Sequence, residues 1–274
     1  LLPNTARVKD VRFDLWGSVT LGVGASSLLA AISQGRTWGW GSGRTSPFLA
    51  VAVIAVPVFV AVERRTPAPL VVLAWFRTRN FAWPVLCQGL ANFAYMGGFF
   101  LIPQVLGKRG LGFGEATVGY LVIARPLAFS LVAPVAAATT MRVGERVAGI
   151  AGALGVVTSM VLWSTVGLHT GTVMIIVATA MSGIGLGIAS PALTSLMAGS
   201  VASGDLGVAG AMQQLSTQLG SVLGSAVLAT VSATAGRADM SMFHVAFLVG
   251  GAVAVLAACA AAQVQPQSGR AVAN

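Results

Sequence analysis

The sequence predicts an all-α integral membrane protein with eight transmembrane helices. Of its 274 residues, 56% are hydrophobic and only 8% are charged, and the mean hydropathy is +0.85. A helix needs roughly 20 predominantly apolar residues to cross the hydrocarbon core, and the chain carries eight such stretches. A soluble domain of this length could not hide so much apolar surface. Because lipid offers no partner for unpaired backbone N–H and C=O groups, each span must be a helix.

The apolar stretches divide into a first pair and a later group of six. The expected spans are 14–33, 46–62, 81–101, 116–138, 147–166, 172–196, 207–232 and 243–263. The predicted order is a cytoplasmic linker at 1–13, two extra central transmembrane helices within 14–62, a cytoplasmic amphipathic linker at 63–80, a six-helix unit at 81–263 and a cytoplasmic tail at 264–274.

The linker between the second and third spans is too short to cross a membrane. Its apolar residues lead to Trp75 and Phe76, and Arg77 and Arg79 follow. An amphipathic helix along the cytoplasmic interface fits this pattern, with the two rings among the lipid headgroups. The alternative is an ordinary connecting loop.

Lysine and arginine are more frequent on the side of the membrane that holds the N-terminus. That side receives Arg7, Lys9, Arg12, Arg64, Arg65, Arg77, Arg79, Arg142, Arg146 and Arg270. The opposite side receives Arg36, Arg44, Lys108, Arg109 and Arg237. Because basic loops remain inside the cell, we expect a multi-pass plasma-membrane protein with both termini in the cytoplasm. Topology thus explains the net charge of +9, and we expect no nucleic-acid partner. The frequent arginine, alanine, glycine and valine indicate a bacterial source.

Polar side chains repeat on one face of the third span and one face of the seventh. The two sets are Gln88, Asn92, Tyr95 and Phe99, and Gln214, Gln218, Ser221 and Ser225. Each set follows helical spacing. Polar groups in a lipid-spanning helix turn toward the protein interior or a cavity, so the pattern predicts a shared, water-accessible cavity. Interhelical hydrogen bonds, worth only about 0.6 kcal/mol each, are the alternative.

Arg125 is a charged residue inside the apolar fourth span. A charge near the bilayer centre costs roughly 2.5–3.5 kcal/mol on insertion scales, so Arg125 is a candidate for substrate binding or coupling. The alternative is a side chain that extends to the headgroups. Pro126 and Pro134 follow in the same span, and each should bend the helix because proline lacks a backbone donor.

Small residues crowd the sixth and seventh spans. They are Gly183, Gly185 and Gly187 with Pro191, and Gly220 and Gly224 in a GxxxG pattern. Small residues let helices approach closely. We interpret them as positions of close packing or as hinges in helices that rock or bend.

The sequence lacks the residue sets that an intramembrane enzyme would need. No acidic residue lies deep in a span, and His169 and His244 adjoin the outer linkers. Cys87 and Cys259 form no C-x-x-C motif, and no spacing indicates a metal or another cofactor. We therefore expect no enzyme activity and no cofactor, which leaves transport or a passive role in the membrane.

A series of short motifs follows in a fixed order along the chain: RFDLWG at 12–17, QGRTWGW at 34–40, ERR at 63–65, PL at 69–70 and FRTRNF at 76–81. This ordered set resembles the fourteen-helix drug/proton antiporters of the EmrB/QacA type in the major facilitator superfamily. The resemblance covers nearly the whole chain and corresponds to helices seven to fourteen. It implies two extra central helices followed by the six-helix C-terminal half of a major facilitator fold, itself an inverted three-plus-three repeat.

The cytoplasmic G-x-x-x-D-R-x-G-x-R loop of that superfamily aligns with residues 137–146. Arg142, Gly144 and Arg146 match it, whereas Ala137 replaces the glycine and Met141 the aspartate. The resemblance implies a gating loop at the three matching residues, with its acidic latch absent. The family often has leucine where this chain has Arg125, and arginine where it has Thr217.

The resemblance implies part of a proton-coupled secondary transporter that exports small amphipathic or drug-like molecules by alternating access. Its expected partners are the lipid bilayer, a small-molecule substrate, the proton as coupling ion and a missing N-terminal six-helix half. Because the chain begins with Leu1 rather than methionine, we expect a fragment. Because it has no carboxylate deep in a span to carry a proton, we expect it to be inactive without the missing half. The candidate cavity residues are Gln88, Asn92, Tyr95, Phe99, Arg125, Gln214 and Gln218. The alternatives are a narrow-substrate metabolite exporter and a non-transporting membrane scaffold.

Overall fold

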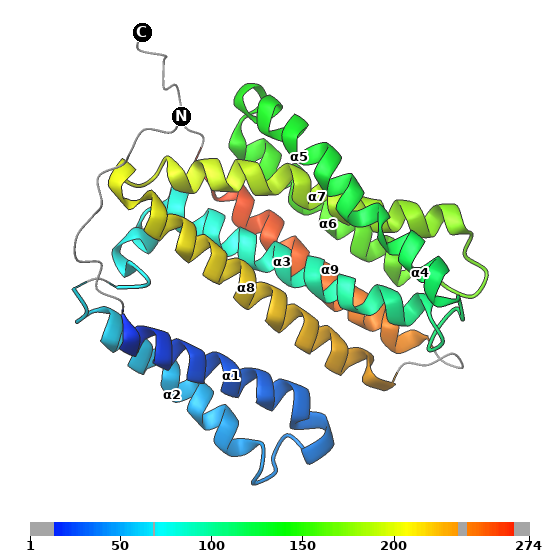
Figure 1. Cartoon of the computed structure of the whole chain (residues 1–274), viewed down its shortest axis with the longest axis horizontal. Helices are drawn as coiled ribbons and strands as arrows, with labels where there is room; N and C mark the ends of the chain where they lie inside the picture. Colours follow the sequence, from blue (N-terminus) through cyan, green and yellow to red (C-terminus); the bar gives the residue numbers. More distant parts are fainter. Residues whose placement is uncertain (1–13, 68, 235–239, 266–274) are drawn as a thin grey trace.

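A computed structural model describes residues 14–67, 69–234 and 240–265, and within these the fold is entirely helical, without strands (Figure 1). The α-helices are α1 (Leu15–Trp38), α2 (Ser46–Glu63), α3 (Arg79–Leu106), α4 (Glu115–Val122), α5 (Ala124–Val143), α6 (Glu145–Ser164), α7 (Thr172–Ala198), α8 (Leu206–Val231) and α9 (Ser241–Ala262). Short 3-10 helices are η1 (Leu73–Arg77), η2 (Ser203–Asp205) and η3 (Ser232–Thr234). The predicted all-α membrane fold is confirmed.

Seven helical segments of the described chain are long and apolar enough to cross a membrane, with α4 and α5 together forming the segment Glu115–Thr140. The eighth expected span, α8, has 26 residues but is not among the seven. Its run of glutamines, serines and threonines lowers its hydropathy. It nevertheless packs closely against α3 within the bundle.

Helix α3 lies at the centre of the six-helix unit and packs against α7, α8 and α9 (Figure 1). Helix α6 packs against α7 and α9, and α5 packs on α7. At one end of this unit Trp163 stacks on Phe247, with ring centroids 5.4 Å apart. Helices α1 and α2 form a hairpin that meets the bundle through α8.

Glycines let several helix pairs approach until their backbones touch. In α8, a Cβ at Gly220 would lie 2.8 Å from the carbonyl carbon of Gly89, and a Cβ at Gly224 would lie 2.7 Å from the same atom of Phe93. In α7, a Cβ at Gly185 would lie 2.6 Å from the backbone oxygen of Gly152. Any side chain at these positions would push the helices apart. Because glycine has none, α3 can pack closely on α8, and α6 on α7.

The span that carries Arg125 is interrupted between α4 and α5, at Ile123. Pro126 has no N–H to donate to the carbonyl of Val122, and its ring crowds that carbonyl. The helical bonds on either side persist, from Ile123 N–H to Gly119 (3.1 Å) and from Leu127 N–H to Ile123 (3.2 Å). The interruption therefore coincides with the one bond that Pro126 removes. Pro134, also expected to bend the span, lies inside α5 without ending it.

The linker after α2 forms the five-residue 3-10 helix η1, which is shorter than the expected amphipathic helix. Its aromatic residues pack onto the start of α3 rather than extending the helix. The ring centroids of Trp75 and Phe76 lie 5.3 Å and 5.8 Å from that of Phe81.

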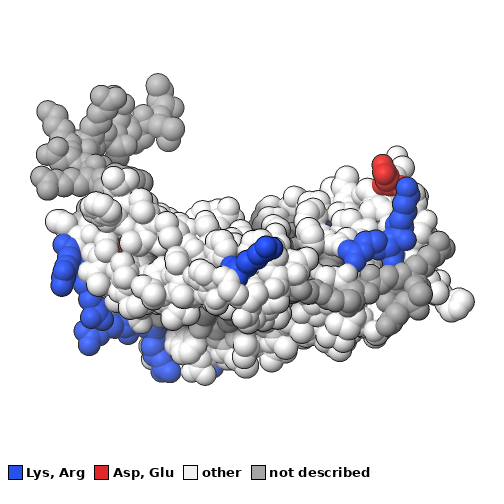
Figure 2. Space-filling view, turned by 90° about the horizontal axis from the view of Figure 1, so that it is seen from below, with Lys and Arg blue, Asp and Glu red and all other residues white. Residues whose placement is uncertain are grey.

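Lysine and arginine side chains gather toward the two ends of the face seen in Figure 2, and most of the surface between them is uncharged. Such a distribution suits a protein whose middle lies in lipid. The predicted positions Arg7, Lys9, Arg12, Arg237 and Arg270 lie outside the described residues, as do segment 1–13 and most of the tail at 264–274.

Candidate substrate site

Arg125 is wholly buried, with no exposed side-chain area, between α5 and α3. Its Nη2 donates a hydrogen bond to the backbone carbonyl of Tyr95. The guanidinium carbon lies 3.5 Å from the centroid of the Tyr95 ring and 5.4 Å from that of Phe99. Its Nε and Nη1 have no hydrogen-bond partner. The side chain thus does not extend to a headgroup, which was the alternative for this residue.

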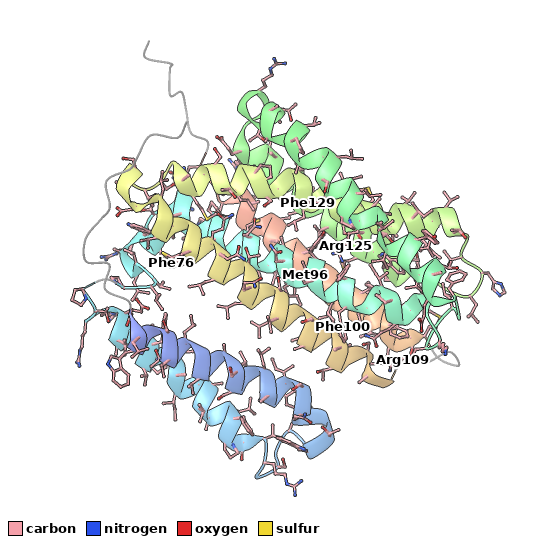
Figure 3. The ribbon with its side chains drawn as sticks, in the orientation of Figure 1. Phe76, Met96, Phe100, Arg109, Arg125 and Phe129 are labelled. Carbon is pink, nitrogen blue, oxygen red and sulfur yellow. The ribbon has the colours of Figure 1, made fainter. Side chains whose placement is uncertain are left out.

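Two neighbouring features hold Arg125 in this place. The interruption at Ile123 puts Arg125 in the first turn of α5. Behind it, Gly183 of α7 packs against the Arg125 backbone, where a Cβ would meet the carbonyl group and lie 3.1 Å from the Cβ of Ala128. Figure 3 shows the Arg125 side chain on the side of α5 that faces Met96 and α3.

No described carboxylate balances the charge of Arg125. The acidic residues of the described chain all lie at helix ends or in short linkers: Asp14, Glu63, Glu115, Glu145 and Asp205. An uncompensated buried cation is costly in a low-dielectric environment. The aromatic rings of Tyr95 and Phe99 offset part of that cost through cation–π contacts.

Of the four positions predicted to share one face of α3, three point into the bundle. Gln88, Asn92 and Tyr95 are buried, whereas Phe99 is 43% exposed. The Asn92 amide donates to the Gln88 backbone oxygen at 2.8 Å, while the Gln88 side-chain oxygen is buried without a partner. These residues therefore lie on the same side of α3 as the contact with Arg125.

The predicted face of α8 divides between two pockets. Ser221 and Ser225 line a pocket between α3 and α8 together with Phe99, whereas the two glutamines line a different pocket. Gln214 and Gln218 are exposed and line a pocket of about 550 Å³ between α8 and α1. The reason is the packing of α8 on α3 through Gly220 and Gly224. The two glutamines lie on one face of α8, and this face turns toward the α1–α2 hairpin.

A pocket of about 590 Å³ between α3 and α8 adjoins the Arg125 site. It is lined by Met96, Phe99, Phe100, Pro103, Gln104, Ser221, Val222 and Ser225. Its size falls within the range of roughly 300–1,000 Å³ for small-molecule sites. Met96 and Phe100 were not among the sequence-predicted positions. Their spacing with Phe99 and Pro103 (i, i+3, i+4, i+7) is the helical signal that would have found them.

Phe99 connects the pocket with Arg125. Its ring lines the α3–α8 pocket and also lies 5.4 Å from the Arg125 guanidinium. An apolar pocket and a buried cation are thus separated by one half-exposed aromatic ring.

The remaining predicted positions lie away from this site. Gly144 connects α5 and α6 with φ +90°, a left-handed conformation that glycine adopts readily. Arg142 is exposed beside it, Arg146 is exposed in the first turn of α6, and the Met141 side chain lies outside the described part. In α7, Gly187 packs close to Phe129, where an added Cβ would lie 3.3 Å from the backbone oxygen, and Pro191 does not interrupt the helix.

No protein-family model matches the chain, but curated bacterial export proteins do. The multidrug resistance protein Stp of Mycobacterium tuberculosis H37Rv is 27% identical over 81% of this chain and 41% of its own length. The tetracenomycin C resistance and export protein of Streptomyces glaucescens is 31% identical over 81% of this chain and 41% of its own length. The cephamycin export protein CmcT of Amycolatopsis lactamdurans is 29% identical over 95% of this chain and 54% of its own length.

The chain therefore spans about half, or less, of the length of these relatives. The resemblance to drug and antibiotic efflux proteins, first indicated by the sequence motifs, is confirmed. These relatives are transporters rather than enzymes. Together with seven segments long and apolar enough to cross a membrane, they fit a multi-pass bacterial membrane protein.

Proposed function

We propose that this chain is the C-terminal part of a proton-coupled exporter that moves small amphipathic molecules by alternating access. The observation that carries the proposal is the similarity to export proteins over 81–95% of the chain. The buried polar face of α3 beside an apolar pocket supports it, because such sites bind small molecules.

In this proposal the substrate lies against α3 and the start of α5. The α3–α8 pocket supplies apolar and aromatic walls, with Gln104, Ser221 and Ser225 as sparse polar groups. Gln88, Asn92 and Tyr95 add hydrogen-bonding capacity deeper in the bundle. Few fixed polar contacts favour tolerance of different substrates. Gln214 and Gln218 would act at the separate pocket beside α1.

We place the proton-coupling carboxylate outside this chain. None of the described acidic residues lies deep in a span, and the aligned part of this chain covers only 41% of the length of two relatives. Transport would then proceed by rocking of this unit against that half. We expect the 274-residue chain alone to be inactive, with both termini in the cytoplasm and the gate at Arg142, Gly144 and Arg146 on the same side.

A narrow-substrate exporter is the second candidate. Two relatives are named for single compounds, tetracenomycin C and cephamycin. Substrate profiling separates the two candidates, since a multidrug exporter moves several unrelated compounds and a dedicated exporter moves one.

The test is efflux from a bacterial strain that lacks its own drug pumps. The strain would express either the 274-residue chain or the full reading frame that contains it, including any upstream codons. We expect energy-dependent efflux of at least one amphipathic compound from the full frame, abolished by a protonophore, and none from the chain alone. Efflux that persists after the proton gradient collapses would contradict proton coupling. Export by the chain alone would contradict the requirement for a second half.

A further inference from the structure

We propose that Arg125 binds the anionic group of the transported molecule, so that the preferred substrates are amphipathic organic anions. This inference rests on the proposed export function and narrows it to one substrate class. A carboxylate, sulfonate or phenolate oxygen is the group that the geometry points to.

The guanidinium leaves part of its hydrogen-bonding capacity unused. Of its nitrogen atoms, Nη2 donates to the Tyr95 carbonyl, whereas Nε and Nη1 are buried with no acceptor. Buried donors of a charged group are expensive to leave unpaired. An anionic oxygen would satisfy them and neutralise the charge at once, since charge-assisted hydrogen bonds are the strongest that arginine forms.

An apolar pocket lies next to the charge. Met96, Phe99 and Phe100 line a space of about 590 Å³ that can hold the apolar part of a small molecule. The Phe99 ring stands between this space and Arg125. Rotation of that half-exposed side chain would bring the anionic end of a bound molecule within reach of Nε and Nη1.

The position of Arg125 argues against two other sources of negative charge. It lies well inside the membrane-spanning segment Glu115–Thr140 and is wholly buried, so a lipid headgroup at the interface does not reach it. The described carboxylates of the chain itself lie at helix ends or in linkers. A bound organic anion is the remaining source that the adjoining pocket can accommodate.

The experiment compares two dyes that share a ring system and differ in charge. They are 8-anilinonaphthalene-1-sulfonate, an anion, and N-phenyl-1-naphthylamine, which is neutral. Binding to the 274-residue chain in phosphatidylcholine nanodiscs is measured by fluorescence titration, with empty nanodiscs subtracted. We expect Arg125→Gln to weaken binding of the anion by about tenfold or more, the loss of one charged hydrogen bond, and to leave the neutral dye unchanged.

Two further variants serve as controls. Arg44→Gln removes a positive charge from an exposed turn between α1 and α2, and it should not change the binding of either dye. Arg125→Lys retains a cation, and its affinity for the anionic dye should lie between those of the unaltered chain and Arg125→Gln.

If Arg125→Gln does not fold, a second experiment tests the anion preference on the unaltered chain. It measures how well octanesulfonate, an anion, and octyltrimethylammonium, a cation, displace the neutral dye. The anion should displace it at about a tenfold lower concentration.

The outcomes separate this inference from the proposed function. The anion site would be overturned if the neutral dye bound as tightly as the anion, or if Arg125→Gln affected both dyes equally. In either case, binding of small molecules in the pocket would still be supported. Failure of both dyes to bind above empty nanodiscs would overturn the pocket as well. An anion preference that survives Arg125→Gln would place the charge recognition elsewhere and refute the role of Arg125.

Discussion

The guanidinium carbon of Arg125 lies 3.5 Å from the centroid of the Tyr95 ring, and this contact joins α5 to α3. The two helices otherwise pack mainly on other partners, α5 on α7 and α3 on α8 and α9. The contacts of Arg125 with the Tyr95 and Phe99 rings, and its hydrogen bond to the Tyr95 backbone, therefore link two walls of the candidate site.

Replacement of Tyr95 tests the contribution of this pair to stability. Tyr95→Leu removes the ring and should lower the free energy of unfolding by about 2 kcal/mol, the upper range for a desolvated cation–π contact. Tyr95→Phe keeps the ring face and should change stability by less than about 1 kcal/mol. Both leave the backbone hydrogen bond in place. Denaturant unfolding in mixed micelles measures the two values, and equal losses would show that the ring face does not matter.

Gly220 tests the close approach of α8 to α3. In Gly220→Ala, the new Cβ would lie 2.8 Å from the Gly89 carbonyl carbon, and overpacking of this kind costs about 1–3 kcal/mol. Gly210→Ala in the same helix is the matched control, because a Cβ there meets nothing within 4 Å. We expect it to be neutral or stabilising by up to about 1 kcal/mol through helix propensity. Similar melting temperatures for the two variants would contradict the packing described here.

Pro126 tests the interruption between α4 and α5. Pro126→Ala supplies an N–H that can donate to the Val122 carbonyl, so α4 and α5 should join into one continuous helix. We expect slower hydrogen exchange around Ile123 and a higher melting temperature. Export by the full reading frame should fall if the junction bends during transport. Unchanged exchange at Ile123 would mean that proline is not the cause of the interruption.

Two buried carboxylates meet where the α1–α2 hairpin joins the linker. Asp14 is 6% exposed and Glu63 is 4% exposed. Each uses one oxygen to accept a backbone N–H, from Gly17 at 2.8 Å and from Val71 at 3.1 Å. The other oxygens, Asp14 Oδ2 and Glu63 Oε1, both lie against Gly17 and have no partner. The pair thus combines like charges with unsatisfied acceptors.

Glu63→Gln should stabilise the protein because its amide can donate to Asp14 Oδ2 while its oxygen still accepts from Val71. We expect a gain of about 1 kcal/mol, the net value of a typical hydrogen bond. Glu115→Gln, at the exposed start of α4, is the control and should stay within about 0.5 kcal/mol of the unaltered chain. Loss of stability in Glu63→Gln would show that the carboxylate itself is needed there.

Much of the fold follows from hydropathy, because spans of about 20 apolar residues have few options in lipid. The interruption near Pro126 also follows from local chemistry. The sequence could not show which neighbour each face would meet. Helical spacing correctly grouped Gln214 with Gln218, yet the Gly220 and Gly224 contacts turn them toward α1 rather than toward Asn92. Periodicity defines a face, whereas tertiary packing decides what that face contacts.

The candidate site was predictable only in part for the same reason. A charged residue such as Arg125 is easily recognised within an apolar span. Its contact with Tyr95, however, depends on how α5 crosses α3. Met96 and Phe100 are ordinary apolar residues of a membrane helix, and only the position of α8 makes them walls of a pocket.

Whether export depends on Arg125 is decided by comparing efflux from the full reading frame with and without this residue. Cells that lack their own pumps would express the unaltered frame or Arg125→Leu, with membrane amounts matched by immunoblot and with Arg44→Leu as the control. We predict energy-dependent export by the unaltered and Arg44→Leu proteins. We also predict at least a roughly tenfold loss in Arg125→Leu, the loss of one charged contact, at an unchanged membrane amount. Full export by Arg125→Leu would contradict a role for the buried guanidinium in transport.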